Sequence, residues 1–203
     1  MSDELIEKLH ESFPWYLTTE DKRDLYAQFK SFPKHKGYYL PDTIYPDLLL
    51  QGDGWDSFIV RDIETGEMKL IRGIIISNSC DIDPANGIRI GQKILCAPII
   101  KLKYYLDALM ENGHEQEQID SIVRDIRDQR ISYIFHLPER AGIMDESIVL
   151  LDDVNSNPLL HYLEKTKKSK IFCLNQFGFY LFIIKISIHF TRLREELRRY
   201  EKI

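Results

Sequence analysis

The sequence predicts an α+β fold in which helices are added to a small, partly open β-barrel. Short runs of alternating or β-branched apolar residues recur along the middle of the chain, separated by polar turns, which is typical of a small barrel. Apolar residues at helical spacing occur near both ends and in one charged segment between strands. With 203 residues, of which 44% are hydrophobic, the chain can bury a core as one compact domain.

We expect residues 1–46 to form a helix and an arm packed on the core. Thr18 stands before an acidic turn, and Leu25 and Phe29 follow four residues apart, so a capped helix should end near Lys30. The rest of this segment is rich in proline and tyrosine. That composition is typical of an irregular arm lying on a core rather than of a free linker.

Residues 47–174 should form the barrel. A strand at 57–63, a turn at 64–67 and a returning strand at 68–78 indicate a hairpin, and another strand is expected at 92–100. Two further strands are expected at 131–137 and 147–151, and residues 171–174 are either another strand or the approach to a helix.

Three more segments predict helices. The strongly charged segment 111–130 carries isoleucines at helical spacing, so we expect an exposed helix inserted between strands. Residues 155–158 have the pattern of an N-cap followed by proline in the first turn of a helix that runs to about Lys165. Residues 175–203 should form a long C-terminal helix, whose apolar first half is too short to span a membrane and is expected in the core.

Composition limits the compartment and the partners. A net charge of -5 provides no general basic field, so any contact with RNA would need a local patch. Three widely spaced cysteines without a Cys-x-x-Cys pair argue against a disulfide framework and a structural zinc site. The amino terminus lacks the basic and apolar regions of a secretory signal, so we expect a cytoplasmic protein without membrane attachment.

We expect no cofactor and no metal. The sequence contains neither a Walker loop nor a Rossmann glycine motif. Asp53, Asp56, Asp81 and Asp83 could gather around a hard cation, but aspartates in turns more often bond their own backbone.

The most informative stretch is an apolar strand that ends in small polar residues. Three consecutive isoleucines at 74–76 indicate a strand buried on both faces, and polar groups at the end of such a strand can face a ligand. The candidate ligand-binding residues are Ser77, Asn78, Ser79, Arg89 and Lys93, and the candidate catalytic residues are Arg72, Cys80 and Asp81.

Cys80 has both a chemical and a structural interpretation. A cysteine nucleophile needs a lowered thiol pKa and a nearby base, which His136 or His189 could supply. The adjacent Asp81 would raise the pKa of the thiol instead, and a free cysteine more often acts as a small hydrophobe.

A local basic patch could bind RNA through phosphate contacts and stacking on tyrosines. The alternative is a solvated surface, which is the usual role of scattered basic residues in an acidic protein. The candidates for the patch are Arg72, Arg89, Lys93, Lys101 and Lys103, with Tyr104 and Tyr105 as the stacking faces.

Four short segments within about 48–100 share a known arrangement. A Gly-Asp pair opens a strand, an arginine precedes an apolar strand that ends in serine, and a later strand ends near proline. These segments, at 51–53, 57–63, 72–77 and 93–98, resemble the opening of the MazF/PemK-like toxins, which are small SH3-like barrels that cleave RNA.

The resemblance implies particular site positions. The catalytic arginine of that family would fall at Ile71 or, with a slip of one residue, at Arg72. The position of its helpful threonine is occupied by Ile99 or Ile100. The chain therefore departs from the family at the place where catalysis would occur, and function depends on the site rather than on the fold.

We therefore expect an SH3-like, partly open β-barrel elaborated with an N-terminal helix, an inserted helix and a long C-terminal helix. Segments 77–82 and 172–192 are also similar to uncharacterised bacterial proteins with a Ser-x-x-Cys-Asp signature, often labelled MazF-like.

The first functional hypothesis is a bacterial or phage protein of a toxin or defence type that acts on RNA. As an enzyme it would be a metal-independent endoribonuclease, with Arg72 stabilising the phosphate and residues 77–81 shaping the site. Its partners would be RNA, an antitoxin-like or defence-system protein, and a second copy in a homodimer. The alternative is a non-catalytic interaction module that holds a partner protein or small ligand at the strand-end pocket. A Cys80-dependent hydrolase or transferase is the third hypothesis.

Overall fold

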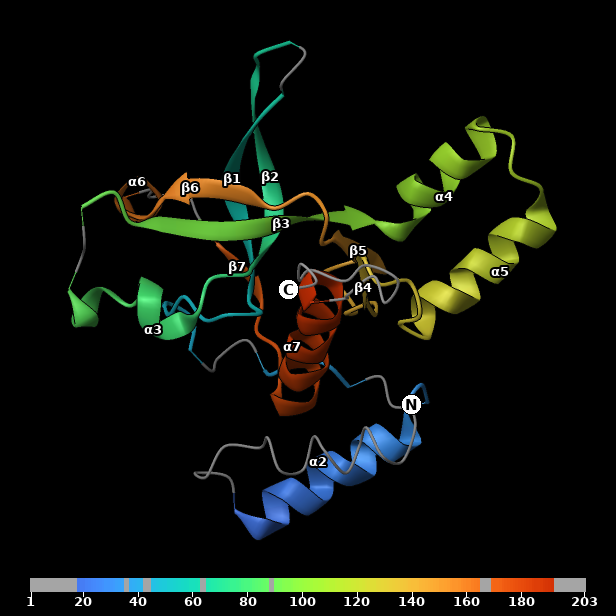
Figure 1. Ribbon diagram of the computed structural model, residues 1–203, viewed down its shortest axis with the longest axis horizontal. Helices are drawn as coiled ribbons and strands as arrows, with labels where there is room; N and C mark the ends of the chain where they lie inside the picture. The colour runs from blue at the N-terminus through green and yellow to red at the C-terminus, as the bar shows by residue number, and fades with distance from the viewer. Residues whose placement is uncertain are drawn as a thin grey trace, which may run out of the picture.

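An antiparallel sheet with helices around it forms the structure, which confirms the predicted α+β class (Figure 1). The computed structural model describes residues 18–34, 37–41, 45–62, 65–87, 90–164 and 169–191. Within these segments the sheet has seven strands. They are β1 (Gly54–Arg61), β2 (Met68–Ile75), β3 (Lys93–Lys101), β4 (Ile134–Leu137), β5 (Ser147–Leu150), β6 (Asn155–Pro158) and β7 (Lys170–Phe172).

The long strand β3 connects the sheet. The strand order is β4-β5-β3-β2-β1-β7, and β6 pairs with β3 as well. On one edge, β3 pairs with β6 from Lys93 to Cys96 and with β5 from Ile99 to Lys101, while β2 pairs along the opposite edge. Every one of these pairings is antiparallel. Within the described residues, no strand pairing joins the two ends of the path, so the sheet is not closed into a barrel.

The helices follow their capping and packing residues. In α2 (Thr19–Ser31), Thr18 is the N-cap and forms a capping box with Asp21, which confirms the predicted N-terminal helix. Leu25 and Phe29 are its buried residues. The other helices are α3 (Ser79–Ile82), the 3-10 helix η1 (Pro84–Asn86), α4 (Leu102–Glu111), α5 (Gln116–Arg127), α6 (Leu159–Glu164) and α7 (Gln176–Thr191).

The helix predicted at 111–130 is confirmed as α5, which is shorter than expected, but the prediction missed α4, a second helix directly before it (Figure 1). Gly113 adopts a φ of +84° in the turn between them, a conformation that glycine reaches without steric cost. The signal for α4 was present in the sequence. Leu102 and apolar residues three and four positions later have helical spacing, and Leu102 is buried.

The prediction that residues 155–158 cap a helix is also wrong, because they form β6. Asn157 is buried, and its side chain forms the two hydrogen bonds that a neighbouring strand would form with Ile59. Oδ1 accepts from the Ile59 N–H at 2.8 Å, and Nδ2 donates to the Ile59 carbonyl at 3.1 Å. The helix starts only at Leu159. Local sequence could not reveal this arrangement, since the partner of Asn157 lies 98 residues away in the chain.

α7 packs against the arm that follows α2. Phe177, Leu181 and Phe182 are buried, which confirms that the apolar C-terminal segment is a core helix. Tyr38 of the arm is also buried, and its ring lies 5.6 Å from that of Phe177, so the arm lies on the core as predicted. The expected continuation of this helix at 192–203 lies outside the described residues. Of the helices in the described segments, none is long and apolar enough to cross a membrane.

Gly178→Ala should lower the free energy of unfolding by about 1–3 kcal/mol, because the added Cβ would lie 2.6 Å from the Tyr38 carbonyl oxygen. In an unobstructed helix the same change stabilises by about 1 kcal/mol, so a loss would report the close approach of α7 to the arm. Ser187→Ala, at an exposed position of α7, is the control and should change stability by less than about 0.5 kcal/mol. Urea unfolding measures both, and a Gly178→Ala protein at least as stable as the parent would contradict this packing.

Candidate functional site

The predicted cluster of polar residues lies where β2 ends. Ile74 and Ile75 are fully buried, and β2 ends at Ile75. The chain then passes through residues 76–78 into α3, which begins at Ser79. The prediction that small polar residues follow a buried strand is therefore confirmed.

Three polar side chains of this cluster stabilise the turn after β2. Each accepts a hydrogen bond from a backbone N–H, so it satisfies a donor that the end of the strand leaves unpaired. These side chains are therefore engaged in holding the chain and are poor candidates for ligand contacts. The bonds are Ser77 Oγ from Leu95 at 2.8 Å, Asn78 Oδ1 from Cys80 at 2.9 Å, and Ser79 Oγ from Gln51 at 2.9 Å.

Cys80 is exposed beside a small concavity, which we call the strand-end pocket. It has a volume of about 280 Å³ and is lined by four leucines, Ile82 and Pro84, together with the polar residues Asp47, Ser79, Cys80 and Asp83. Neither His136 nor His189 lines it, so the histidines that were expected to activate Cys80 are not in place to do so. Asp81 is exposed and does not line this pocket.

Arg72 lies in different surroundings, on an exposed part of β2. Its charge acts on an ion pair between Lys101 Nζ and Asp145, whose atoms are 2.5 Å apart. Lys101 holds the pKa of Asp145 below its usual range, and Arg72 lowers that pKa further. The ammonium of Lys101 also lies 5.9 Å from the centre of the exposed Tyr104 ring. We call Arg72, Lys101 and Tyr104 the Arg72 surface.

The structure separates the Arg72 surface from the strand-end cluster. The strand register sets Arg72 opposite Ile99, two residues before Lys101 at the end of β3, whereas Ser77 bonds to Leu95 near its start. Six residues of extended strand separate Lys101 from Leu95, which is about 20 Å. Arg72 and Ser77 therefore cannot contact one small ligand together.

The remaining predicted residues divide between these two places. Lys93 is exposed at the first residue of β3, near the strand-end cluster, and Lys103 is exposed at the start of α4. Tyr105 is half-buried and packs in the core around α4 and α5, and burial raises the pKa of its hydroxyl to about 12, so it is not a free stacking face. Arg89 lies outside the described residues.

The aspartates that could have gathered around a cation have other roles. Asp53 is buried and forms an ion pair with Lys170 at 2.7 Å, and burial raises the pKa of Asp53 despite this partner. Asp56 accepts hydrogen bonds from the backbone and side chain of Ser169. In the part of the chain that the structure describes, no group of three His, Cys, Asp or Glu side chains could hold a metal ion.

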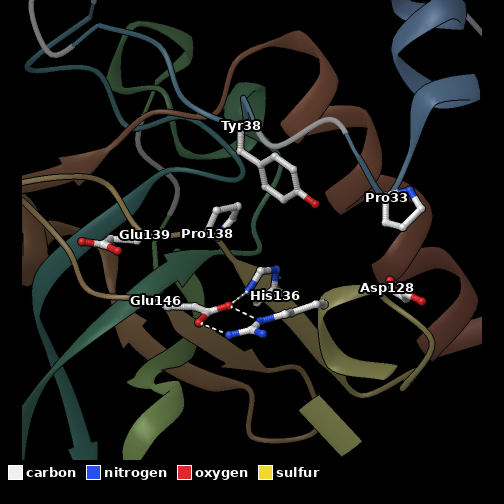
Figure 2. Close-up of a pocket in the computed structure, with 8 residues that line it drawn as sticks. Pro33, Tyr38, Asp128, His136, Pro138, Glu139 and Glu146 are labelled. Atoms are coloured by element: carbon white, nitrogen blue, oxygen red, sulfur yellow. Dashed lines mark hydrogen bonds and ion pairs between the residues drawn. The ribbon is translucent and has the colours of Figure 1, made fainter. Parts of the chain in front are cut away.

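A larger cavity, of about 520 Å³, lies beside His136 (Figure 2). We call it the His136 cavity. His136 comes from β4, Glu146 immediately precedes β5, and Arg127 ends α5. His136 Nε2 lies 2.8 Å from Glu146 Oε1, and the Arg127 guanidinium binds both Glu146 oxygens at 2.8 Å. The dashed lines in Figure 2 mark these contacts.

The carboxylate of Glu146 is held in its charged form. Hydrogen bonds from Arg127 and then from His136 lower the pKa of Glu146 to about 2, against the opposing effect of burial. A carboxylate bound to one nitrogen of an imidazole fixes the orientation and tautomer of the ring. The arrangement can therefore present the other nitrogen to a ligand or to a proton in a fixed direction.

Gln129 holds the backbone of His136 in place. Its side chain accepts from the His136 N–H at 3.2 Å and donates to the His136 carbonyl at 3.0 Å. Its own carbonyl accepts from Lys185 Nζ of α7 at 2.5 Å. Burial lowers the pKa of Lys185 to about 8. The core helix α7 is thereby connected to the wall of the His136 cavity.

The sequence contained only part of the signal for this cavity. His136 lies on the predicted strand 131–137, and Glu146 precedes the predicted strand 147–151. Pairing these two strands as a hairpin brings the two residues together. Arg127 approaches from α5, and no sequence spacing connects it with either residue.

Comparisons with known proteins give no family assignment: no family model matches the chain, and no curated protein matches it.

Glu146→Gln should destabilise the protein at pH 7 by about 1–2 kcal/mol, a value discounted for a side chain that is 28% exposed. Because the pKa of Glu146 is about 2 when folded and 4.5 ordinarily, only the unfolded chain takes up this proton as the pH falls below about 4.5. The stabilisation is therefore present above pH 4.5 and lost as the pH falls towards 2.

The measurement compares the free energy of unfolding at pH 7 and pH 3. Glu146→Gln should flatten the loss of stability with acid, while Glu117→Gln, at an exposed position of α5, should leave the parent profile unchanged. If Glu146→Gln kept the full acid sensitivity of the parent, the charged network would not exist in solution.

Proposed function

We propose that this protein is an SH3-like barrel protein of the MazF/PemK-like type that acts on RNA through the Arg72 surface. The position of Arg72 is the observation that carries the proposal: it is exposed two register positions from Lys101, whose ammonium lies 5.9 Å from the exposed Tyr104 ring, so positive charge and a stacking face occur on one surface. A cytoplasmic toxin or defence role, with an antitoxin-like or defence-system partner, follows from the same resemblance and belongs to the same proposal.

The packing of β1, β2, β3 and β6 supports a partly open SH3-like barrel. β1, β2 and β3 contribute with α6 to one apolar cluster, in which the rings of Phe58 and Tyr162 stack 4.6 Å apart beside the buried Ile75 and Cys96. Asn157 of β6 bonds the backbone of β1 through its side chain. The hydrogen bonds of the Asn157 side chain thus connect β6 to β1, where a closed barrel would have a strand pairing.

The register of β2 and β3 supports Arg72 as the counterpart of the arginine in the resemblance. Gly73 pairs with Pro98, so continuing the register by one residue sets Arg72 beside Ile99. Ile71 instead packs against the apolar cluster. The arginine and threonine positions of the resemblance would therefore be neighbours across two strands, with Arg72 on the exposed surface.

The proposed role of Arg72 is to bind a phosphate of the RNA backbone. A guanidinium suits this role because its fixed donors match phosphate oxygens, and the exposed Tyr104 ring can stack on a base. Ile99 has no hydroxyl, and Cys80 and Asp81 lie towards the other end of β3. The proposal therefore assigns no catalytic step to Cys80 or Asp81, and any cleavage would depend on Arg72 stabilising charge on the phosphate.

A second candidate function is an interaction module at the strand-end pocket. The observation that favours it is the pocket itself, whose volume of about 280 Å³ and four lining leucines suit an aliphatic side chain of a partner. In this candidate Cys80 lines the pocket as a contact residue rather than a nucleophile.

Cys80 should react with iodoacetamide at pH 7 no faster than a free model thiol, because no histidine or lysine lines its pocket within the described residues. Cys96 and Cys173 are buried and should not react in the folded protein. Mass spectrometry after timed alkylation measures both results. An alkylation rate of Cys80 about tenfold or more above that of the model thiol would support the hypothesis of a Cys80-dependent hydrolase.

Arg72→Ala should weaken binding of single-stranded RNA about tenfold and reduce the dependence of log affinity on log salt by about 0.7, which corresponds to one phosphate contact. Filter binding at several salt concentrations measures both quantities. Lys93→Ala, at the far end of β3, removes an exposed charge as a matched control and should retain the affinity and the salt slope of the parent.

The same proteins are expressed in cells and scored for growth arrest and cut RNA. The proposal fails if the parent binds no RNA, or if Arg72→Ala binds RNA as the parent does. Absence of RNA binding by the parent would favour the interaction module.

A further inference from the structure

None of the residues that carry the proposed function lines the His136 cavity. Its volume of about 520 Å³ lies within the range of small-molecule sites. It is bordered by the arm after α2, the end of α5, β4 and the segment before β5 (Figure 2). A cavity built from four separate parts of the chain is held open by the fold itself.

One nitrogen of the buried His136 side chain opens onto this cavity. His136 is 5% exposed, and its Nε2 is bonded to Glu146. Its Nδ1 has no hydrogen-bond partner among the described residues, and Figure 2 shows this nitrogen directed away from Glu146, into the space bordered by Tyr38, Pro33 and Asp128. Because the side chain is more than nine-tenths buried and this nitrogen is accessible from the cavity, it marks a position where a ligand atom can form a hydrogen bond.

The network around His136 decides what that ligand atom must be. Glu146 is ionised at neutral pH and can only accept, so the hydrogen of a neutral imidazole lies on Nε2 and a lone pair remains on Nδ1. His136 therefore accepts a hydrogen bond in this tautomer, and the ligand must donate one.

The charges of the cavity also favour a donor. The Arg127 guanidinium donates hydrogen bonds to both oxygens of Glu146, so its positive charge is balanced by that carboxylate. Asp128 and Glu139 add two further carboxylates to the lining, and among the described residues only Asp128 has a cationic partner, the exposed Arg130 at 3.1 Å. The cavity thus has more negative than positive charge, which disfavours an anion and favours a cation.

The walls suit a ligand with an apolar body. Pro33 and Pro138 line the cavity with aliphatic rings, and the buried Tyr38 presents an aromatic ring. An aliphatic chain that ends in a charged nitrogen would satisfy the walls and the acceptors together.

We infer that the His136 cavity binds a small organic cation, an alkylammonium or alkylguanidinium. Its N–H groups donate to His136 Nδ1 and to the carboxylate of Asp128, the charge of Glu139 adds to the attraction, and its chain lies against Pro33 and Pro138. Glu146 and Arg127 act as positioning residues that hold the imidazole in the accepting tautomer.

The test uses the full chain with butylguanidinium and 1,4-diaminobutane as probes, and with n-butylurea and butyrate as neutral and anionic comparisons. Isothermal titration calorimetry should give at least tenfold tighter binding for one of the cations than for either comparison. Glu139→Gln should weaken the binding about three- to tenfold. Glu117→Gln, an exposed change outside the cavity, should have no effect.

A second measurement reports His136 directly, because substitution of this buried residue could prevent folding. On binding of the cation, the ¹⁵N resonance of His136 Nδ1 should move in the direction expected for an acceptor that gains a hydrogen bond. The inference is overturned if neither cation binds, if the urea or butyrate binds equally well, or if binding leaves both the His136 resonance and the Glu139→Gln affinity unchanged.

Discussion

The structure depends on the pairing of β3 along both of its edges. β2 occupies one edge, while β6 and β5 share the other in sequence, so Cys96 has a strand partner on each side. This arrangement joins the apolar cluster around Phe58 to the clusters beneath α5 and α7. It also fixes the distance between the two ends of the strand, because an extended backbone has a nearly constant rise per residue.

That distance determines how the surface is organised. The Arg72 surface lies at one end of β3 and the strand-end cluster at the other, so residues that are close in sequence serve different purposes. Ser77, Asn78 and Ser79 satisfy backbone donors where β2 ends. By contrast, one ring nitrogen of His136 has no partner in the described part of the chain, while Gln129, Glu146 and Lys185 hold its surroundings. The three side chains at the end of β2 thus have a structural role, whereas the ring nitrogen of His136 is available to a ligand.

The sequence predicted those features that depend on neighbouring residues. The capping box of α2, the buried strand before Ser77 and the core helix α7 each follow from local pattern, and each was found. Features that depend on distant partners were missed. Asn157 resembles a helix cap but bonds Ile59, and the His136 cavity combines residues from two strand ends and a helix. Sequence adjacency also suggested one site for Arg72 and Cys80, although the strand geometry separates them.

The separation of the Arg72 surface from the strand-end cluster is the central claim, and a distance measured in solution tests it most directly. Spin labels on the native Cys80 and on Arg72→Cys, with the buried Cys96 and Cys173 unlabelled, provide the pair. The account predicts a single distance distribution centred at about 20 Å or more, as the length of extended β3 requires. A centre below about 10 Å, the span of three strand residues, would place both residues in one site and contradict the account.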